Sequence, residues 1–180
     1  ILFSSFGVTW NGARVFNGRN PLPGSLIAGA ALWLLACQWP GFEVGSEIRG
    51  QLSAFIIAGY AWLTAYEFWR GRNEPLVSRW PGIFLFFTHG ALFLLRTPLA
   101  ALLRGREVDQ ALTSAWLNVL SLEALLMTIS TAFILLAMSK ERTELRHKKA
   151  AMIDPLTGLL NRRALLQDAD VLRQQQVSRD

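Results

Sequence analysis

The sequence predicts an all-α fold: an integral membrane helical bundle of about five spans whose last span continues into a charged helix. Of the 180 residues, 52% are hydrophobic and 17% are charged, whereas roughly 25% of residues are charged in a soluble domain. Residues 1–139 hold nine Lys or Arg and seven Asp or Glu, and residues 140–180 hold nine and six. Abundant aromatic and branched apolar residues exclude a disordered chain. The single Cys37 excludes a disulfide framework within the chain.

Five apolar stretches approach the length of about 20 residues that a helix needs to cross a membrane. The first stretch is apolar from its first residue and has no initial Met, so we expect a span that is cut off at its start. The last two stretches are long enough to cross with a tilt. The predicted spans, which together form a transmembrane sensor region over residues 1–138, are 1–16, 22–39, 52–69, 80–103 and 115–138.

A soluble bundle of buried helices is the alternative fold. Its helices would need polar faces, and the segments IFLFFTHGALFLLR from Ile83 and ALLMTISTAFILLAM from Ala124 have none. Trp39, Trp69 and Trp80 also fall at the ends of predicted spans, where indole rings favour the headgroup layer. These features favour the membrane bundle.

The positions of Lys and Arg predict the orientation of the bundle. Arg14 at the end of the first predicted span, the loops after the first and third predicted spans and residues 140–149 together carry ten of these side chains, and the alternate loops carry three. Basic residues are retained on the cytoplasmic side of a membrane, so we expect the carboxyl end to be cytoplasmic. The net charge of +5 then marks orientation, and we expect the lipid bilayer as a partner and no nucleic acid.

Two charged residues within the spans need a partner or a task, because charge at bilayer depth costs free energy. Arg96 and Glu123 lie on consecutive antiparallel spans, each about 10–12 Å below the outer surface by the standard helical rise. We hypothesise an Arg96–Glu123 ion pair inside the bundle. In the alternative, Arg96 extends outward to the headgroups and Glu123 is neutral or bonded to a hydroxyl such as that of Ser121.

His89 is the only histidine within the predicted spans and lies near the bilayer midplane. Because imidazole gains and loses a proton near neutral pH, a pocket lined by His89, Arg96 and Glu123 is a candidate sensor site. A neutral His89 bonded to a neighbouring helix is the simpler alternative, and no second His or Cys recurs at the spacing of metal ligands. Glu67 can pair with Arg70 on the helix surface, and we expect no further role for it.

The charged segment 139–153 predicts a signalling helix, because it is rich in helix formers and has no Gly or Pro. A continuous helix over 115–153 would be roughly 58 Å long at the standard rise. Met138, Leu145 and Met152 recur every seven residues, as in the seam of a coiled coil, which predicts a homodimer through this helix. A single helix lying along anionic headgroups is the alternative.

A turn is predicted where the segment DPLTGLLNRRAL begins, because the residue before a proline avoids helical geometry and Gly158 adds backbone freedom. Asn161 is a plausible cap for a following helix. This segment resembles the opening of the GGDEF domain of diguanylate cyclases, and the segments TWNGARVFNG from Thr9 and EFWRG from Glu67 are similar to the multispan region of its membrane-bound bacterial members. The motif positions are Asp154, Leu156, Thr157, Gly158, Leu159, Asn161 and Arg162.

The resemblance implies a bacterial inner-membrane signalling protein whose parent condenses two GTP into cyclic di-GMP, with Mg²⁺ and GTP as its cofactor and substrate. Only the start of the α/β GGDEF domain, 154–180, is expected here. The signature loop of two glycines, an acidic pair and Phe is absent. We therefore place no catalytic, cofactor-binding or metal-binding residue in this chain. The resemblance implies that Asp154, Asn161 and Arg162 hold the joint between the signalling helix and the catalytic domain. The stimulus is unknown.

Two other functions stay open at this point. A small transporter or channel would need a continuous polar path, for which His89, Arg96, Asn118 and Glu123 are the available residues. A receptor or scaffold with a degenerate GGDEF domain would keep the same helices and lack the enzyme.

Overall fold

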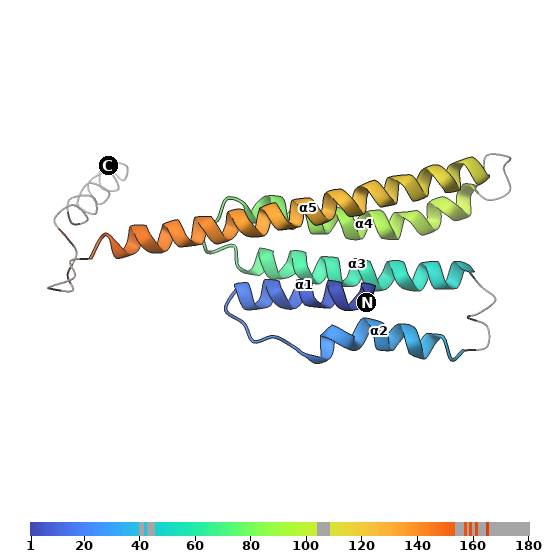
Figure 1. Cartoon of the computed structure of the whole chain (residues 1–180), viewed down its shortest axis with the longest axis horizontal. Coiled ribbons are helices and arrows are strands. Elements are labelled where there is room, and N and C mark those ends of the chain that lie inside the picture. Colours follow the sequence, from blue (N-terminus) through green and yellow to red (C-terminus); the bar gives the residue numbers. More distant parts are fainter. Residues whose placement is uncertain are drawn as a thin grey trace, which may run out of the picture. The chain divides into compact units, whose positions relative to one another are not determined.

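The structure is a computed structural model that describes residues 1–39, 42, 46–103, 109–153, 157, 159, 161 and 165. The described residues form five helices and no strand, so the predicted all-α fold class is confirmed for this part of the chain (Figure 1). The helices are α1 (Leu2–Phe16), α2 (Gly24–Ala36), α3 (Ser46–Arg70), α4 (Arg79–Leu103) and α5 (Asp109–Ala150).

Each helix covers one of the five predicted apolar stretches, and α5 also covers most of the predicted signalling helix. Two helices begin earlier than predicted, since α3 starts at Ser46 and α5 at Asp109. Among the described residues, one segment, Ser121–Ala150 within α5, is long and apolar enough to cross a membrane, and α2 is apolar but shorter. The five predicted spans are therefore not confirmed and stay a prediction.

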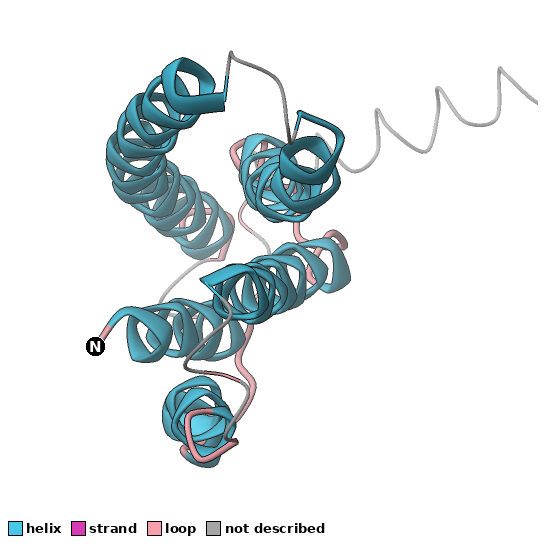
Figure 2. Cartoon of the chain, turned by 90° about the vertical axis from the view of Figure 1, so that its right-hand side faces the viewer, coloured by secondary structure: helices cyan, strands magenta, loops and turns pink. Residues whose placement is uncertain are grey.

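The chain divides into two compact units, Ile1–Leu136 and Ala137–Asp180, which we call the helix bundle and the carboxyl-terminal unit. Within the bundle, α3 contacts α1 on one side and α4 on the other, and α2 packs mainly on α1 (Figure 2). Small buried residues line α3 at spacings of three and four. Such residues allow neighbouring helices to approach closely. They are Ala54, Ala58, Ala61 and Ala65.

Two glycines fix how α2 sits against its neighbours. A Cβ atom at Gly7 of α1 would lie 2.9 Å from the carbonyl oxygen of Ser25, and one at Gly29 of α2 would lie 2.9 Å from the Tyr60 ring. The Tyr60 hydroxyl donates a hydrogen bond to that Ser25 carbonyl over 2.5 Å and accepts one from the Gly29 backbone N–H over 3.1 Å. α1 and α2 thus approach at backbone contact distance, and the Tyr60 side chain connects α3 to α2.

Asn11 connects α1 to the start of α2. Its side-chain oxygen accepts a hydrogen bond from the backbone N–H of Leu22 over 2.6 Å, and its side-chain nitrogen donates to the Ser25 hydroxyl over 2.7 Å. Asn11 is buried, and these bonds satisfy its polar atoms as burial requires.

Candidate functional site: polar side chains buried among apolar helices

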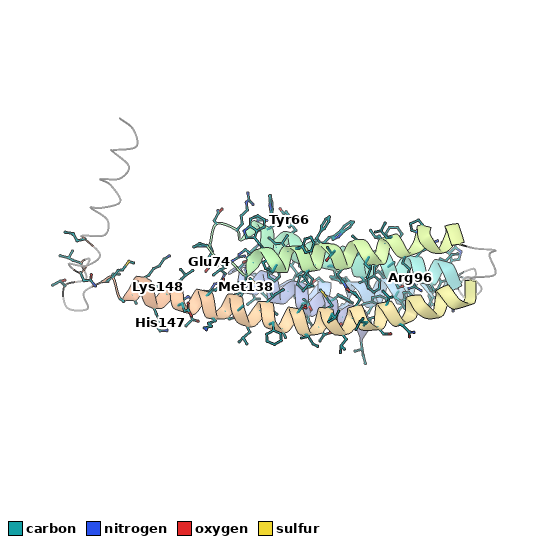
Figure 3. The ribbon with its side chains drawn as sticks, turned by 90° about the horizontal axis from the view of Figure 1, so that it is seen from above. Tyr66, Glu74, Arg96, Met138, His147 and Lys148 are labelled. Carbon is teal, nitrogen blue, oxygen red and sulfur yellow. The ribbon has the colours of Figure 1, made fainter. Side chains whose placement is uncertain are left out.

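Apolar and polar side chains are distributed unusually in the helix bundle. Large apolar side chains are exposed along its helices, for example Phe84 with 70% and Phe133 with 68% of its surface exposed (Figure 3). At the same time Arg14, Glu67 and His89 are buried. Charged side chains are almost never fully buried unless they are paired, so each buried charge points to a specific partner.

Glu67, near the end of α3, is the centre of the first buried group. Its Oε1 atom accepts hydrogen bonds from Arg14 at 3.1 Å and from Arg19 at 2.5 Å, and its backbone carbonyl accepts one from the Asn17 side chain at 2.5 Å. Glu67 is 2% exposed. Two guanidinium groups therefore share one carboxylate oxygen where water is largely excluded.

Arg79, the first residue of α4, extends this group to a third helix. Its guanidinium donates to the Asn17 side chain at 2.9 Å, to the Phe68 carbonyl at 3.2 Å and to Glu74 at 3.0 Å. A Cβ atom at Gly71 would lie 2.5 Å from the Asn17 side-chain oxygen, so only glycine leaves room for this contact. We call Arg14, Asn17, Arg19, Glu67, Glu74 and Arg79 the Glu67 cluster.

The Glu67 cluster was not predicted from the sequence. Glu67 was expected to pair with Arg70 on the helix surface, whereas it is buried and bonded to Arg14 and Arg19, some fifty residues earlier in the chain. An unpaired charge in an apolar segment is costly, so the sequence could have indicated that Glu67 has a partner. The identity of that partner depends on which helix ends meet.

The second buried group joins α4 to α5. Nδ1 of His89 lies 2.5 Å from Oε1 of Glu123, and His89 is 4% exposed. The His89 ring stacks on Phe6 of α1, with centroids 5.7 Å apart, and packs against Phe93 at 4.9 Å. Neither Nε2 of His89 nor Oε2 of Glu123 has a hydrogen-bond partner among the described residues, although both atoms are buried.

The predicted Arg96–Glu123 ion pair is not formed in the part of the chain that the structure describes, because Glu123 pairs with His89 instead. The helix bounds give the reason. Glu123 lies fourteen residues after the start of α5 at Asp109, and His89 lies fourteen before the end of α4 at Leu103. The two are therefore level on antiparallel helices, about 21 Å from these ends. Arg96, which is half-buried, lies two turns closer to the end of α4.

The predicted coiled-coil seam is only partly open to a second chain. Along α5, Met138 is fully buried, Leu145 is half-buried and Met152, just beyond the helix, is 40% exposed. Met138, His147 and Lys148 are labelled along this helix in Figure 3. Any seam contact in a dimer therefore falls on Leu145 and Met152.

Asn161 of the DPLTGL segment folds back on the end of α5. Its side chain donates a hydrogen bond to the carbonyl of Ala151 over 2.6 Å, and its backbone N–H donates to the carbonyl of Met152 over 2.8 Å. The backbone N–H of Leu165 donates to the Asn161 carbonyl over 3.0 Å, which is the spacing of a helical turn. Asn161 thus links the end of one helix to a following turn.

Several motif positions cannot be compared with the structure. Thr157 and Leu159 are described, and the Thr157 hydroxyl accepts a hydrogen bond from the Leu159 backbone N–H over 3.4 Å. The remaining predicted positions, Asp154, Leu156, Gly158 and Arg162, lie outside the described residues.

Other features of the described residues offer less chemistry. An open pocket of about 340 Å³ is lined by apolar side chains only, so it could hold an apolar ligand without polar recognition. Its lining residues are Ala36, Trp39, Phe42, Ile48 and Leu52. Within the described ranges, no group of three or more His, Cys, Asp or Glu side chains is placed to hold a metal ion.

Over the described residues the fold is all-helical, and buried polar groups link the apolar helices. Comparison with known protein families, with curated protein sequences and with solved structures finds no match to this chain.

Proposed function

We propose that this chain is the membrane sensor and signal-transmission part of a bacterial inner-membrane protein that resembles a diguanylate cyclase. The observation that carries the proposal is α5, a single helix of 42 residues from Asp109 to Ala150. Its first part is apolar, its last part carries Lys and Arg, and it ends four residues before Asp154 of the GGDEF-like segment. A continuous helix of this kind can carry a displacement from a membrane to an attached domain.

The exposed side chains support a lipid environment for the bundle. Side chains such as Leu35 of α2, Phe55 of α3 and Leu95 of α4 are 71%, 64% and 63% exposed. Large continuous apolar surfaces mark sites of contact with a membrane or another protein. A helix surrounded by lipid keeps its apolar side chains outward and its polar side chains inside the bundle. The bundle follows this pattern, because Glu67 and Arg14 of the Glu67 cluster are buried while large apolar side chains are exposed.

The contacts of Asn161 support a mechanical joint. Asn161 bonds to the carbonyls of Ala151 and Met152, so a movement of the α5 end pulls on the segment that follows. In the parent, Mg²⁺ and GTP would bind to the GGDEF domain and two chains would associate through α5. The register or rotation of α5 would then set whether two GTP-loaded domains meet.

Insertions in α5 test this proposal in the full-length protein. Two residues inserted between Thr143 and Glu144 rotate everything that follows by about 200°, whereas seven residues restore the phase after about two turns. We expect the two-residue insertion to change cellular cyclic di-GMP several-fold and the seven-residue insertion to retain regulated output. Equal output from both insertions would contradict a transmission role for α5.

A further inference from the structure

We propose that the His89–Glu123 pair is a proton-binding site through which the bundle responds to acidification, with His89 Nε2 as the atom that takes up the proton. This inference deepens the proposed function, on which its signalling consequence rests. It starts from geometry. His89 is 4% exposed, its Nδ1 contacts Glu123, and its Nε2 is buried and has no hydrogen-bond partner among the described residues.

The proton balance of the pair follows from its contacts. An ionised carboxylate only accepts hydrogen bonds, so with Glu123 ionised the hydrogen of the His89–Glu123 contact sits on Nδ1 and Nε2 is free of hydrogen. In this state the pair carries a charge of −1 from Glu123. One proton taken from the medium binds Nε2, converts His89 to imidazolium and brings the pair to zero net charge. No bond other than N–H forms or breaks.

Two effects act in opposite directions when the proton binds. Burial of a net charge among apolar side chains is costly, which favours proton uptake and the neutral ion pair. The new Nε2–H group would lack an acceptor, and an unsatisfied buried donor is also costly, which opposes uptake. Imidazole is the side chain suited to change charge near neutral pH under such a balance.

Among the charged residues of the surrounding helices, Glu123 is the partner of His89, because the others belong to the Glu67 cluster or lie at other positions along their helices. On α1 the only charged residue is Arg14, which bonds to Glu67 of α3 in the Glu67 cluster. The other charged residues of α3 lie within its first four residues or at Arg70. On α4, Arg79 belongs to the same cluster and Arg96 lies two turns beyond His89. On α5, the charged residues besides Glu123 are Asp109 and those from Lys140 onward.

Proton uptake would change how α5 is held. Before uptake, the His89 Nδ1–H group donates to an ionised carboxylate without a counter-charge; uptake makes the donor cationic and adds the attraction between imidazolium and carboxylate, so α4 and α5 are drawn together at His89. The helices also approach at Gly82, where a Cβ atom would lie 3.1 Å from Ile134. Loss of the proton leaves the Glu123 carboxylate without a counter-charge and loosens this attachment of the helix that leads to Asn161.

Ring-nitrogen NMR of the chain in lipid nanodiscs tests proton binding directly. The chain has two histidines, so His147→Gln leaves His89 as the single labelled ring. We expect its nitrogens to pass from a one-proton to a two-proton signature as the pH falls from about 8 to 5, the range in which histidine titrates. This titration leaves the pair unaltered, so it does not depend on whether any variant of the pair folds. A constant protonation state over this range would overturn the proposal.

A spin-label distance between α4 and α5 tests the coupling. Phe84→Cys and Phe133→Cys place labels at exposed positions in a Cys37→Ser background. We expect the distance to shorten on acidification, the change to be lost in Glu123→Gln, and the matched control Glu144→Gln to behave as the parent. A distance that does not change with pH, or a change in distance that persists in Glu123→Gln, would contradict the coupling. Equal output from the two insertions would overturn the signalling function, and proton binding by His89 could still be measured. Regulated output that depends on the insertion, together with a constant protonation state of His89, would overturn this inference alone.

Discussion

At the scale of single residues, buried charges act as links between helices. Glu67 joins α3 to Arg14 of α1 and to Arg19 of the following loop, and Arg79 continues the connection to α4. Three arginines and two glutamates meet in this cluster. Removing one member of a buried ionic group is more damaging than the net strength of the group suggests, because the remaining charges stay buried without compensation.

Glu67→Gln therefore destabilises the bundle by about 3 kcal/mol, the lower end of the range for a broken buried ion pair. Unfolding in mixed detergent micelles measures this loss. Glu144→Gln is the matched control, since Glu144 and its partner Lys140 are exposed and 3.9 Å apart, and such surface pairs contribute about 1 kcal/mol or less. Equal losses in the two variants would show that the cluster contributes nothing beyond a surface pair.

Residue-level prediction from the sequence succeeded in part. The need of Glu123 for a partner within the bundle was recognised, and so was the possibility that His89 bonds to a neighbouring helix, but these two residues were not paired with each other. The partner itself depended on the register of α4 against α5. A seven-residue difference in position along α4 separates His89 from Arg96, and both lie on the same helical face.

At the scale of elements, close helix contact depends on glycine where a backbone atom faces it. Gly7 and Gly12 both belong to α1, yet a Cβ atom at Gly7 would lie 2.9 Å from the Ser25 carbonyl oxygen, and one at Gly12 would meet no atom within 4 Å. Both residues are glycines within the same helix, so replacing either by alanine changes the intrinsic helix propensity by the same amount. A difference between the two variants therefore reports packing.

Gly7→Ala is expected to destabilise the contact of α1 with α2 by about 1–3 kcal/mol, because an added methyl group must displace backbone. Gly12→Ala is expected to stabilise the protein slightly, since alanine is the better helix former and the space is open. Thermal unfolding of the two purified variants provides the measurement. A similar shift of both in the same direction would contradict this assignment of the α1–α2 contact.

Element positions were predictable because apolar runs and helix formers act locally. The continuity of α5 followed from a segment without Gly or Pro, and the end of the helix near Asp154 followed from the proline after it. The early starts of α3 and α5 were not predicted, because apolar content was used to place the helix ends and these first turns are polar. The error in the start of α5 placed Glu123 too close to the beginning of its helix, level with Arg96 instead of His89.

At the scale of the whole molecule, the exposed apolar surface of the bundle and the apolar part of α5 lead us to expect a membrane location. We expect the chain to stay with the membrane after alkaline carbonate extraction, since Ser121–Ala150 alone is long and apolar enough to span.

Topology can be measured by cysteine labelling, because Cys37 is the only cysteine. In a Cys37→Ser background, a membrane-impermeant maleimide is expected to label Gln38→Cys in spheroplasts. Asn73→Cys and Lys149→Cys, both at exposed positions, should react only after permeabilisation, because we expect the basic loops to lie on the cytoplasmic side. Labelling of Lys149→Cys in intact spheroplasts would reverse the orientation, and labelling of all three would contradict an embedded bundle.

The sequence by itself determined the all-helical class, the approximate positions of the five helices and the long charged extension of α5. These properties depend on composition and on patterns within one helix. Only the tertiary structure decided that Glu67 meets Arg14 and Arg19, that Glu123 meets His89, and that Asn161 bonds to the end of α5. Each of these contacts joins residues nine or more positions apart, and their pairing depends on helix register and on which helix ends come together, neither of which a local pattern specifies.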